Sequence, residues 1–107
     1  MWTIGASIMA GEIEGRSLVG DAAFVARHAL VQGSIIGSGA RVEHGAVVRG
    51  SLLLPGAVVH HDAKVEGSIL GEGAVVGAGA QVEGLTVVQG GAHVAEGTTV
   101  FGGRVAA

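Results

Sequence analysis

The 107-residue chain contains no cysteine, and aromatic residues make up only 3% of it. Without cysteine there is no disulfide framework and no thiol chemistry, which fits a reducing compartment, so we expect a cytoplasmic protein. Basic residues are also few, because six Lys and Arg stand against nine Asp and Glu, for a net charge of −3. This balance provides no basic patch, so we expect no nucleic-acid partner.

Targeting and membrane segments are absent as well. The opening stretch MWTIGASIMAGEI has neither a basic start nor a sustained apolar run, so it does not predict a signal peptide. No run of about 20 apolar residues exists that could cross a bilayer. Collagen is excluded because glycine does not fall at every third position, and an apolar content of 49% excludes disorder.

Glycine, by contrast, is abundant, with 21 residues of 107, and it belongs to a repeat. Four blocks of 17 residues follow one another without a linker, and a fifth block is one residue longer. The blocks are residues 17–33, 34–50, 51–67, 68–84 and 85–102. Self-similarity at a fixed period of this size is the sequence signature of a solenoid.

A shorter period of about six residues lies inside each block, and small residues follow each aliphatic residue at fixed offsets. The aliphatic columns are Val19, Ile36, Leu53, Leu70 and Val88; Val25, Val42, Val59, Val76 and Val94; and Val31, Val48, Val65, Val82 and Val100. A six-residue unit is too short for a helical repeat but suits a short strand followed by a tight corner. The aliphatic residue then points inward, and glycine supplies a positive φ at the corner.

Three such units make one triangular coil, and successive coils stack as parallel strands. The pattern therefore predicts an all-β, three-sided parallel β-helix of about six coils, roughly 29 Å long. We expect a single β-helix domain over residues 1–107. Residues 1–16 form an imperfect first coil, 17–102 five regular coils and 103–107 the start of a final coil. Open strand edges are expected at both ends.

The repeat resembles that of the hexapeptide-repeat proteins, which form left-handed parallel β-helices. Several coils begin with Ser-aliphatic-aliphatic-Gly, as in Ser34–Gly37 (SIIG) and Ser68–Gly71 (SILG). In this respect residues 17–105 look like the C-terminal β-helix of sugar-1-phosphate nucleotidyltransferases, such as mannose-1-phosphate guanylyltransferase and glucose-1-phosphate adenylyltransferase. In that family the catalytic residues lie in an upstream Rossmann-like domain, so the resemblance implies no catalytic residue in this chain.

The role implied by the resemblance is a non-catalytic oligomerisation or regulatory module in nucleotide-sugar synthesis. It implies no cofactor and no metal, and as partner either a second copy or a nucleotidyltransferase catalytic domain or subunit. Two alternatives remain open. One is a hexapeptide-repeat acyltransferase, and the other is a structural β-helix that self-assembles through its open ends. Whether the chain alone is an enzyme is therefore undecided by the sequence, although we expect no catalysis from it.

The outward positions beside the first aliphatic column predict an interface. Side chains alternate along a strand, so the neighbours of an inward residue face outward. On this face the outward residues are aliphatic, namely Leu18, Ile35, Leu52, Leu54, Ile69 and Val87. An exposed row of this kind usually marks a partner surface, although β-propensity alone would also produce it. Another face is polar and places Arg49 beside Glu66, a cross-strand pair of opposite charge.

Histidines supply the candidates for chemistry. His44 and His61 occupy the same position one coil apart, so we expect them in one column, while His28 and Asp62 stand at corner positions that are glycine elsewhere. Corner-forming and surface polarity is the simplest interpretation. In the acyltransferase alternative His61 is the general base, helped by Asp62, with His44 nearby. A third interpretation is a zinc site shared between trimer subunits, as in carbonic anhydrases of this fold, which needs three imidazoles.

Overall fold

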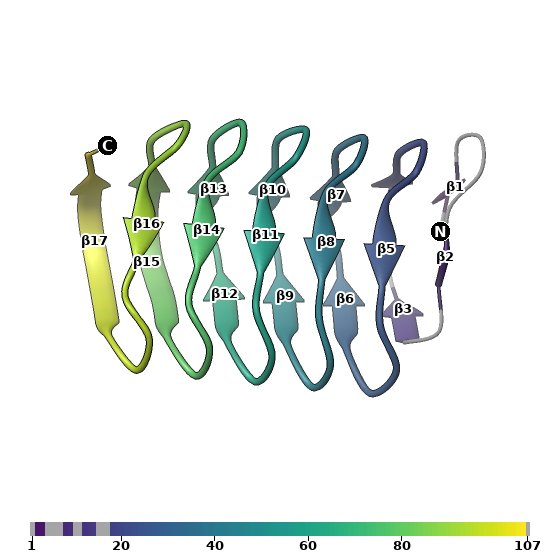
Figure 1. The fold of residues 1–107 in the computed structure, drawn as a ribbon, viewed down its shortest axis with the longest axis horizontal. Coiled ribbons are helices and arrows are strands. Elements are labelled where there is room, and N and C mark those ends of the chain that lie inside the picture. Colours follow the sequence, from purple (N-terminus) through teal and green to yellow (C-terminus); the bar gives the residue numbers. More distant parts are fainter. Residues whose placement is uncertain (1, 4–7, 10–11, 15–17, 107) are drawn as a thin grey trace.

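The computed structural model describes residues 2–3, 8–9, 12–14 and 18–106. Within these ranges the secondary structure consists of strands, and no helix able to span a membrane occurs there. Figure 1 shows the strands wound around one axis into a solenoid, whose principal extents are 31 × 22 × 19 Å. The longest extent agrees with the roughly 29 Å expected from stacked parallel strands.

Three columns of short parallel strands form the three faces of the prism. The ladder face contains β1 (Trp2–Thr3), β4 (Leu18–Val19), β7 (Ile35–Ile36), β10 (Leu52–Leu53) and β13 (Ile69–Leu70). The histidine face contains β2 (Ile8–Met9), β5 (Phe24–Val25), β8 (Arg41–Val42), β11 (Val58–Val59), β14 (Val75–Val76) and β16 (His93–Val94). The charged face contains β3 (Glu12–Glu14), β6 (Leu30–Gln32), β9 (Val47–Arg49) and β12 (Lys64–Glu66).

Two longer strands, β15 (Gln81–Val88) and β17 (Thr99–Val105), run from the charged face round a corner into the ladder face. They join these two faces into one 11-stranded sheet, whereas the histidine face is a separate 6-stranded sheet. In Figure 1 the front strands β5, β8 and β11 run downward and the strands behind them run upward, while the chain advances from right to left. This sense of winding is left-handed.

The predicted all-β, left-handed parallel β-helix is thus confirmed. The 17-residue period sets the strand register, so that Leu52 pairs with Ile69 and Val59 with Val76 in parallel. About five turns are complete among the described residues, slightly fewer than the six expected.

The core is a stack of inward valines, leucines and alanines. The inward valine, isoleucine and leucine side chains of the three columns, from Val19 to Val94, are at most 3% exposed, and the alanines between them are also buried. Burial contributes about 1.5–3 kcal/mol for each large aliphatic side chain. Ordering the backbone costs about 1–2 kcal/mol per residue, so a single coil cannot stabilise itself and each depends on its neighbours.

A ladder of buried hydroxyl groups lies at the corner that leads from the charged face to the ladder face. Its members are Ser34, Ser51, Ser68 and Thr86. The Ser68 hydroxyl donates to the carbonyl oxygen of Glu66 at 2.9 Å and accepts the N–H of Thr86 at 3.3 Å. Buried backbone groups need partners, and here the hydroxyls provide them at a corner too short for regular pairing.

The extra residue of the fifth block is accommodated at this same corner. Glu83 pairs with Phe101 and Thr86 with Gly103, so Gly84 and Leu85 together oppose one residue of the next coil. Leu85 has a φ of 64° and a side chain that is 81% exposed. The result is a β-bulge that projects a leucine side chain outward.

Candidate functional site

Two regions contain the residues that the sequence analysis singled out, and the first is the row of aliphatic residues on the ladder face. Strand register places them at consecutive levels, in the order Leu18, Ile35, Leu52, Ile69 and Val87, followed by Arg104. Leu54 follows Leu52 by two positions and is half-buried. We call Ile35, Leu52, Ile69 and Val87 the aliphatic ladder.

Three of the four side chains of the aliphatic ladder are well exposed although they are large and hydrophobic. The exposed fractions are 45% for Ile35, 41% for Ile69 and 38% for Val87. A continuous row of such side chains is typical of a surface that contacts another molecule. The row can bury apolar area against a partner, but it carries no group that could perform acid–base chemistry.

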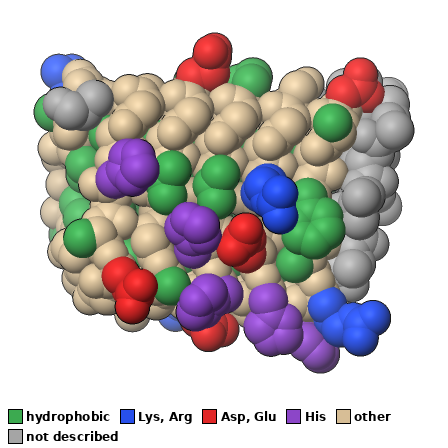
Figure 2. All heavy atoms as spheres, in the orientation of Figure 1, with side chains coloured by type: hydrophobic (Ala, Val, Ile, Leu, Met, Phe, Trp, Pro, Cys, Tyr) green, Lys and Arg blue, Asp and Glu red, His purple; other side chains and the backbone are tan. Residues whose placement is uncertain are grey.

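The second region, which we call the histidine corner, joins the histidine face to the charged face and contains Arg27, His28, His44, His61 and Asp62. Figure 2 shows histidines gathered on the histidine face and along its lower edge. His28 and Asp62 have φ values of 64° and 59°, so both adopt the conformation that glycine adopts at equivalent corners. This outcome confirms the corner-forming part of the prediction for these two residues.

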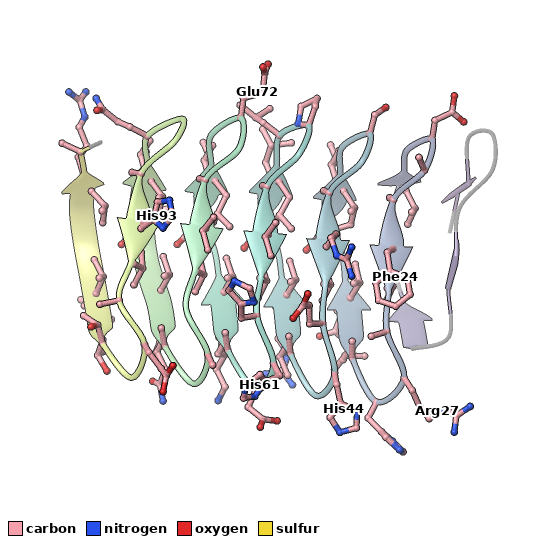
Figure 3. The ribbon with its side chains drawn as sticks, in the orientation of Figure 1. Phe24, Arg27, His44, His61, Glu72 and His93 are labelled. Carbon is pink, nitrogen blue, oxygen red and sulfur yellow. The ribbon has the colours of Figure 1, made fainter. Side chains whose placement is uncertain are left out.

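The histidine corner brings the predicted residues into looser contact than a catalytic dyad requires. His61 Nδ1 lies 3.5 Å from Asp62 Oδ2, and the two side chains are 61% and 69% exposed. A hydrogen bond of that length between water-exposed groups is weak. His44 does lie in the expected column (Figure 3), but its ring contacts His28 edge-on, with 5.2 Å between the ring centroids.

A more closely paired imidazole lies on the adjacent strand. His60 Nδ1 is 3.2 Å from Glu43 Oε1, and the other Glu43 oxygen, Oε2, is 3.6 Å from Arg41 Nε. The Arg41 guanidinium in turn lies 5.2 Å from the centre of the Phe24 ring. This chain of contacts crosses three coils. The sequence analysis did not single out His60 for chemistry, although the 17-residue period places His60 one level from Glu43.

Neither the histidine corner nor the His60–Glu43 pair forms a three-ligand metal centre within the described part of the chain. No group of three or more His, Cys, Asp or Glu side chains is arranged there to hold an ion. The suggested zinc site between trimer subunits stays a prediction, because it would require residues from other copies. On the charged face the expected pair forms, with Arg49 Nη1 3.9 Å from Glu66 Oε1.

The winding, the short strands and the aliphatic–glycine–alanine columns define a left-handed β-helix built from hexapeptide repeats. Within that class the chain belongs to the family described as the GMPPB C-terminal domain, whose model matches residues 13–107. No curated protein sequence matches the chain.

Solved structures share the fold at low identity. One is the acetyltransferase domain of PglB from Neisseria gonorrhoeae FA1090, with 23% identity over 90% of this chain and a TM-score of 0.80. Another is a hexapeptide transferase family protein from Anaplasma phagocytophilum, with 20% identity over 98% of this chain and a TM-score of 0.91. This chain spans 51% of the first and 69% of the second. At such identities the similarity establishes the fold alone.

Proposed function

We propose that this chain is the non-catalytic β-helix module of a sugar-1-phosphate nucleotidyltransferase, where it assembles and regulates the catalytic part. The observation that carries the proposal is the match of residues 13–107 to the GMPPB C-terminal domain family. Catalysis would lie in a separate domain or subunit. The most direct genetic check is the adjoining coding sequence, where a nucleotidyltransferase domain immediately upstream would support the proposal.

The aliphatic ladder provides the physical basis for assembly. Ile35, Ile69 and Val87 expose apolar area in a straight row on a regular β-helical scaffold, so this chain itself loses little conformational entropy when a partner binds there. We propose that Leu18, Ile35, Leu52, Leu54, Ile69 and Val87 form the contact surface, and that the simplest partner is a second copy of the chain.

Acyl transfer is the second candidate function, favoured by the imidazole–carboxylate contacts of His61 with Asp62 and of His60 with Glu43. Each could act as a general base only if an acceptor were held within hydrogen-bond reach. The block sequence contains no insertion beyond the single residue Leu85 that could form a wall for such an acceptor. We therefore rank this activity below the assembly role.

Two parallel assays of the purified chain test whether it catalyses nucleotidyl transfer or acyl transfer by itself. With sugar-1-phosphates and nucleoside triphosphates we expect no pyrophosphate release, and with acetyl-coenzyme A and amino- or hydroxy-sugars we expect no release of coenzyme A. His61→Ala and His60→Ala are matched variants. Turnover by the wild type that either variant abolishes would overturn the non-catalytic assignment and identify the base.

A further inference from the structure

We propose that His28 and His44 form a two-imidazole chelate for a divalent first-row transition metal ion such as Cu²⁺, Ni²⁺ or Zn²⁺. Both ligands belong to one chain, so the site differs from the zinc site between trimer subunits that the sequence suggested. The pair lies on the histidine corner, between the histidine face and the charged face, which is the edge of the prism opposite the ladder face. The inference is therefore independent of the proposed assembly role.

The spacing of the two rings is the observation that carries the proposal. The ring centroids of His28 and His44 are 5.2 Å apart, and the ring planes are nearly perpendicular, at 85°. Two imidazoles that bind one tetrahedral ion, each through a nitrogen at about 2.0–2.1 Å, have ring centres about 5 Å apart. The pair thus already has the separation of two ligands of one ion. Both side chains are exposed, so rotation about their side-chain bonds can aim one nitrogen of each at a common point.

The ring nitrogens of this pair are not engaged elsewhere in the described part of the chain. No side-chain hydrogen bond or ion pair there involves His28 or His44. By contrast, Nδ1 of His60 and Nδ1 of His61 each lie within 3.5 Å of a carboxylate oxygen. Neutral imidazole is the commonest metal ligand in proteins, and it binds through a ring nitrogen. Of these four histidines, His28 and His44 are the two whose nitrogens are available to an ion.

The backbone of the corner brings the two rings together. His28 has a φ of 64° at a position that is Gly45 one coil later and Gly79 three coils later. Non-glycine residues at positive φ are uncommon, although histidine is among those that tolerate it. Because Gly45 carries no side chain, nothing on that residue separates the His28 ring from the ring of His44 beside it.

A carboxylate approaches the same place from the following coil. Asp62 Oδ1 occupies the space that a Cβ on Gly45 would fill, so the carboxylate extends back toward the level of His44. In Figure 3 the Arg27 side chain extends away from His44, toward the N-terminal end of the prism. The negative charge of Asp62 favours a cation here, and its oxygens can accept hydrogen bonds from water molecules on the ion.

The number and type of ligands define which ions the site takes. No group of three protein ligands occurs among the described residues, so water supplies the remaining positions around the ion. The affinity is accordingly weaker than that of a closed four-ligand site. Imidazole nitrogen suits copper, nickel and zinc, whereas magnesium and calcium prefer oxygen ligands. Among the three suitable ions, Cu²⁺ binds most tightly.

Chelation clips two neighbouring coils together. His28 belongs to the block 17–33 and His44 to the block 34–50, so the ion bridges adjacent turns of the solenoid. The two imidazoles meet only when these coils are stacked, so the ion binds the folded chain in preference to the unfolded chain. We therefore expect Zn²⁺ to raise the melting temperature, and a chelator to reverse the rise.

Calorimetric titration of the purified chain with Cu²⁺, Ni²⁺ and Zn²⁺ tests the site. We expect one tightly bound ion per chain and no binding of Mg²⁺ at the same concentrations. Loss of an outer-shell partner typically costs a metal site about 10–100-fold in affinity, so loss of a ligand, in His28→Gly or His44→Ala, should cost at least about tenfold. His28→Gly should not lower the melting temperature without metal, because glycine adopts a positive φ readily. His93→Ala removes an exposed histidine from β16, is the control and should leave the affinity unchanged.

Two results would overturn the inference. Equal affinities of the wild type and His28→Gly would show adventitious binding by single surface histidines. Loss of binding in His61→Ala but not in His28→Gly would place the ion between His44 and His61 instead. Nuclear magnetic resonance localises the ion independently, since Zn²⁺ should shift the ring signals of His28 and His44 and leave those of His93 in place; equal shifts for all five histidines would also contradict the assignment.

Discussion

The hydroxyl oxygen of Ser34 accepts a hydrogen bond from the backbone N–H of Ser51, one coil further along, at 3.0 Å. The Ser51 hydroxyl repeats the arrangement with the N–H of Ser68 at 3.2 Å, and Thr86 ends the series by accepting the N–H of Gly102 at 2.9 Å. Each hydroxyl thereby links two coils at the short corner. The short corner adjoins the aliphatic ladder, so these bonds position the surface that we assign to assembly.

Removal of one member should show the energetic value of this hydroxyl ladder. Ser51→Ala deletes the acceptor of the Ser68 N–H and the donor to the carbonyl oxygen of Arg49. The carbonyl oxygen of Arg49 still accepts the N–H of Gly67, but the buried N–H of Ser68 loses its partner. An unpaired buried N–H costs about 1–3 kcal/mol, which chemical denaturation would measure as a lower free energy of unfolding. Ser38→Ala, at an exposed corner, is the control and should change it by less than about 0.5 kcal/mol. Equal effects of the two variants on the free energy of unfolding would refute the stabilising role of the hydroxyl ladder.

A charge in the central stack should abolish folding. Val59 is fully buried between Val42 and Val76 in the column of the histidine face. An unpaired buried carboxylate costs several kcal/mol, a large part of the 5–15 kcal/mol that typically stabilises a domain. We expect Val59→Asp to lose the β-sheet circular dichroism signal. Val58→Asp places the same charge on the outer side of the strand and should stay folded; a folded Val59→Asp chain would contradict the register.

Much of the architecture follows from columns that the sequence displays directly. The inward column containing Val59 and Val76 fixes the strand register, and the positive φ values of His28 and Asp62 follow from their corner positions. Ala22 also has a positive φ, of 58°, at the position that Gly39 and Gly56 occupy in the next two coils. The repeat period therefore predicts this corner as well, although alanine at that position does not by itself indicate the conformation.

Side-chain contacts were less predictable than the fold. The pairing of His60 with Glu43 depends on rotamers, which periodicity does not specify. Likewise the ring of His44 contacts the ring of His28, its neighbour across the corner, although His61 occupies the position equivalent to His44 one coil further on. The extra residue of the fifth block was visible, but its location in the bulge at Leu85 depends on how two coils pair. The exposed side chain of Leu85 at this bulge was missed for that reason.

Asp62 provides a test of the corner interpretation. Its φ is 59°, and Gly79 occupies the equivalent position one coil later with a φ of 68°. Because glycine adopts this conformation without steric cost, Asp62→Gly should leave the free energy of unfolding unchanged or raise it by up to about 1 kcal/mol. Gly79→Ala is the reverse control and should lower it by about 1–2 kcal/mol. Marked destabilisation by Asp62→Gly would show that the carboxylate has a structural role beyond the corner.

The central claim, that the aliphatic ladder assembles the protein, is tested most directly by the mass of the particle in solution. Sedimentation velocity at micromolar concentration should give an oligomer for the wild type and a folded monomer for Leu52→Glu/Ile69→Glu, since burying two carboxylates in the contact is prohibitive. Val47→Glu/Gln81→Glu adds the same charge on the charged face, at the levels flanking Lys64, and should keep the wild-type mass. A monomeric wild type, or a double glutamate variant of the ladder that stays assembled, would contradict the account.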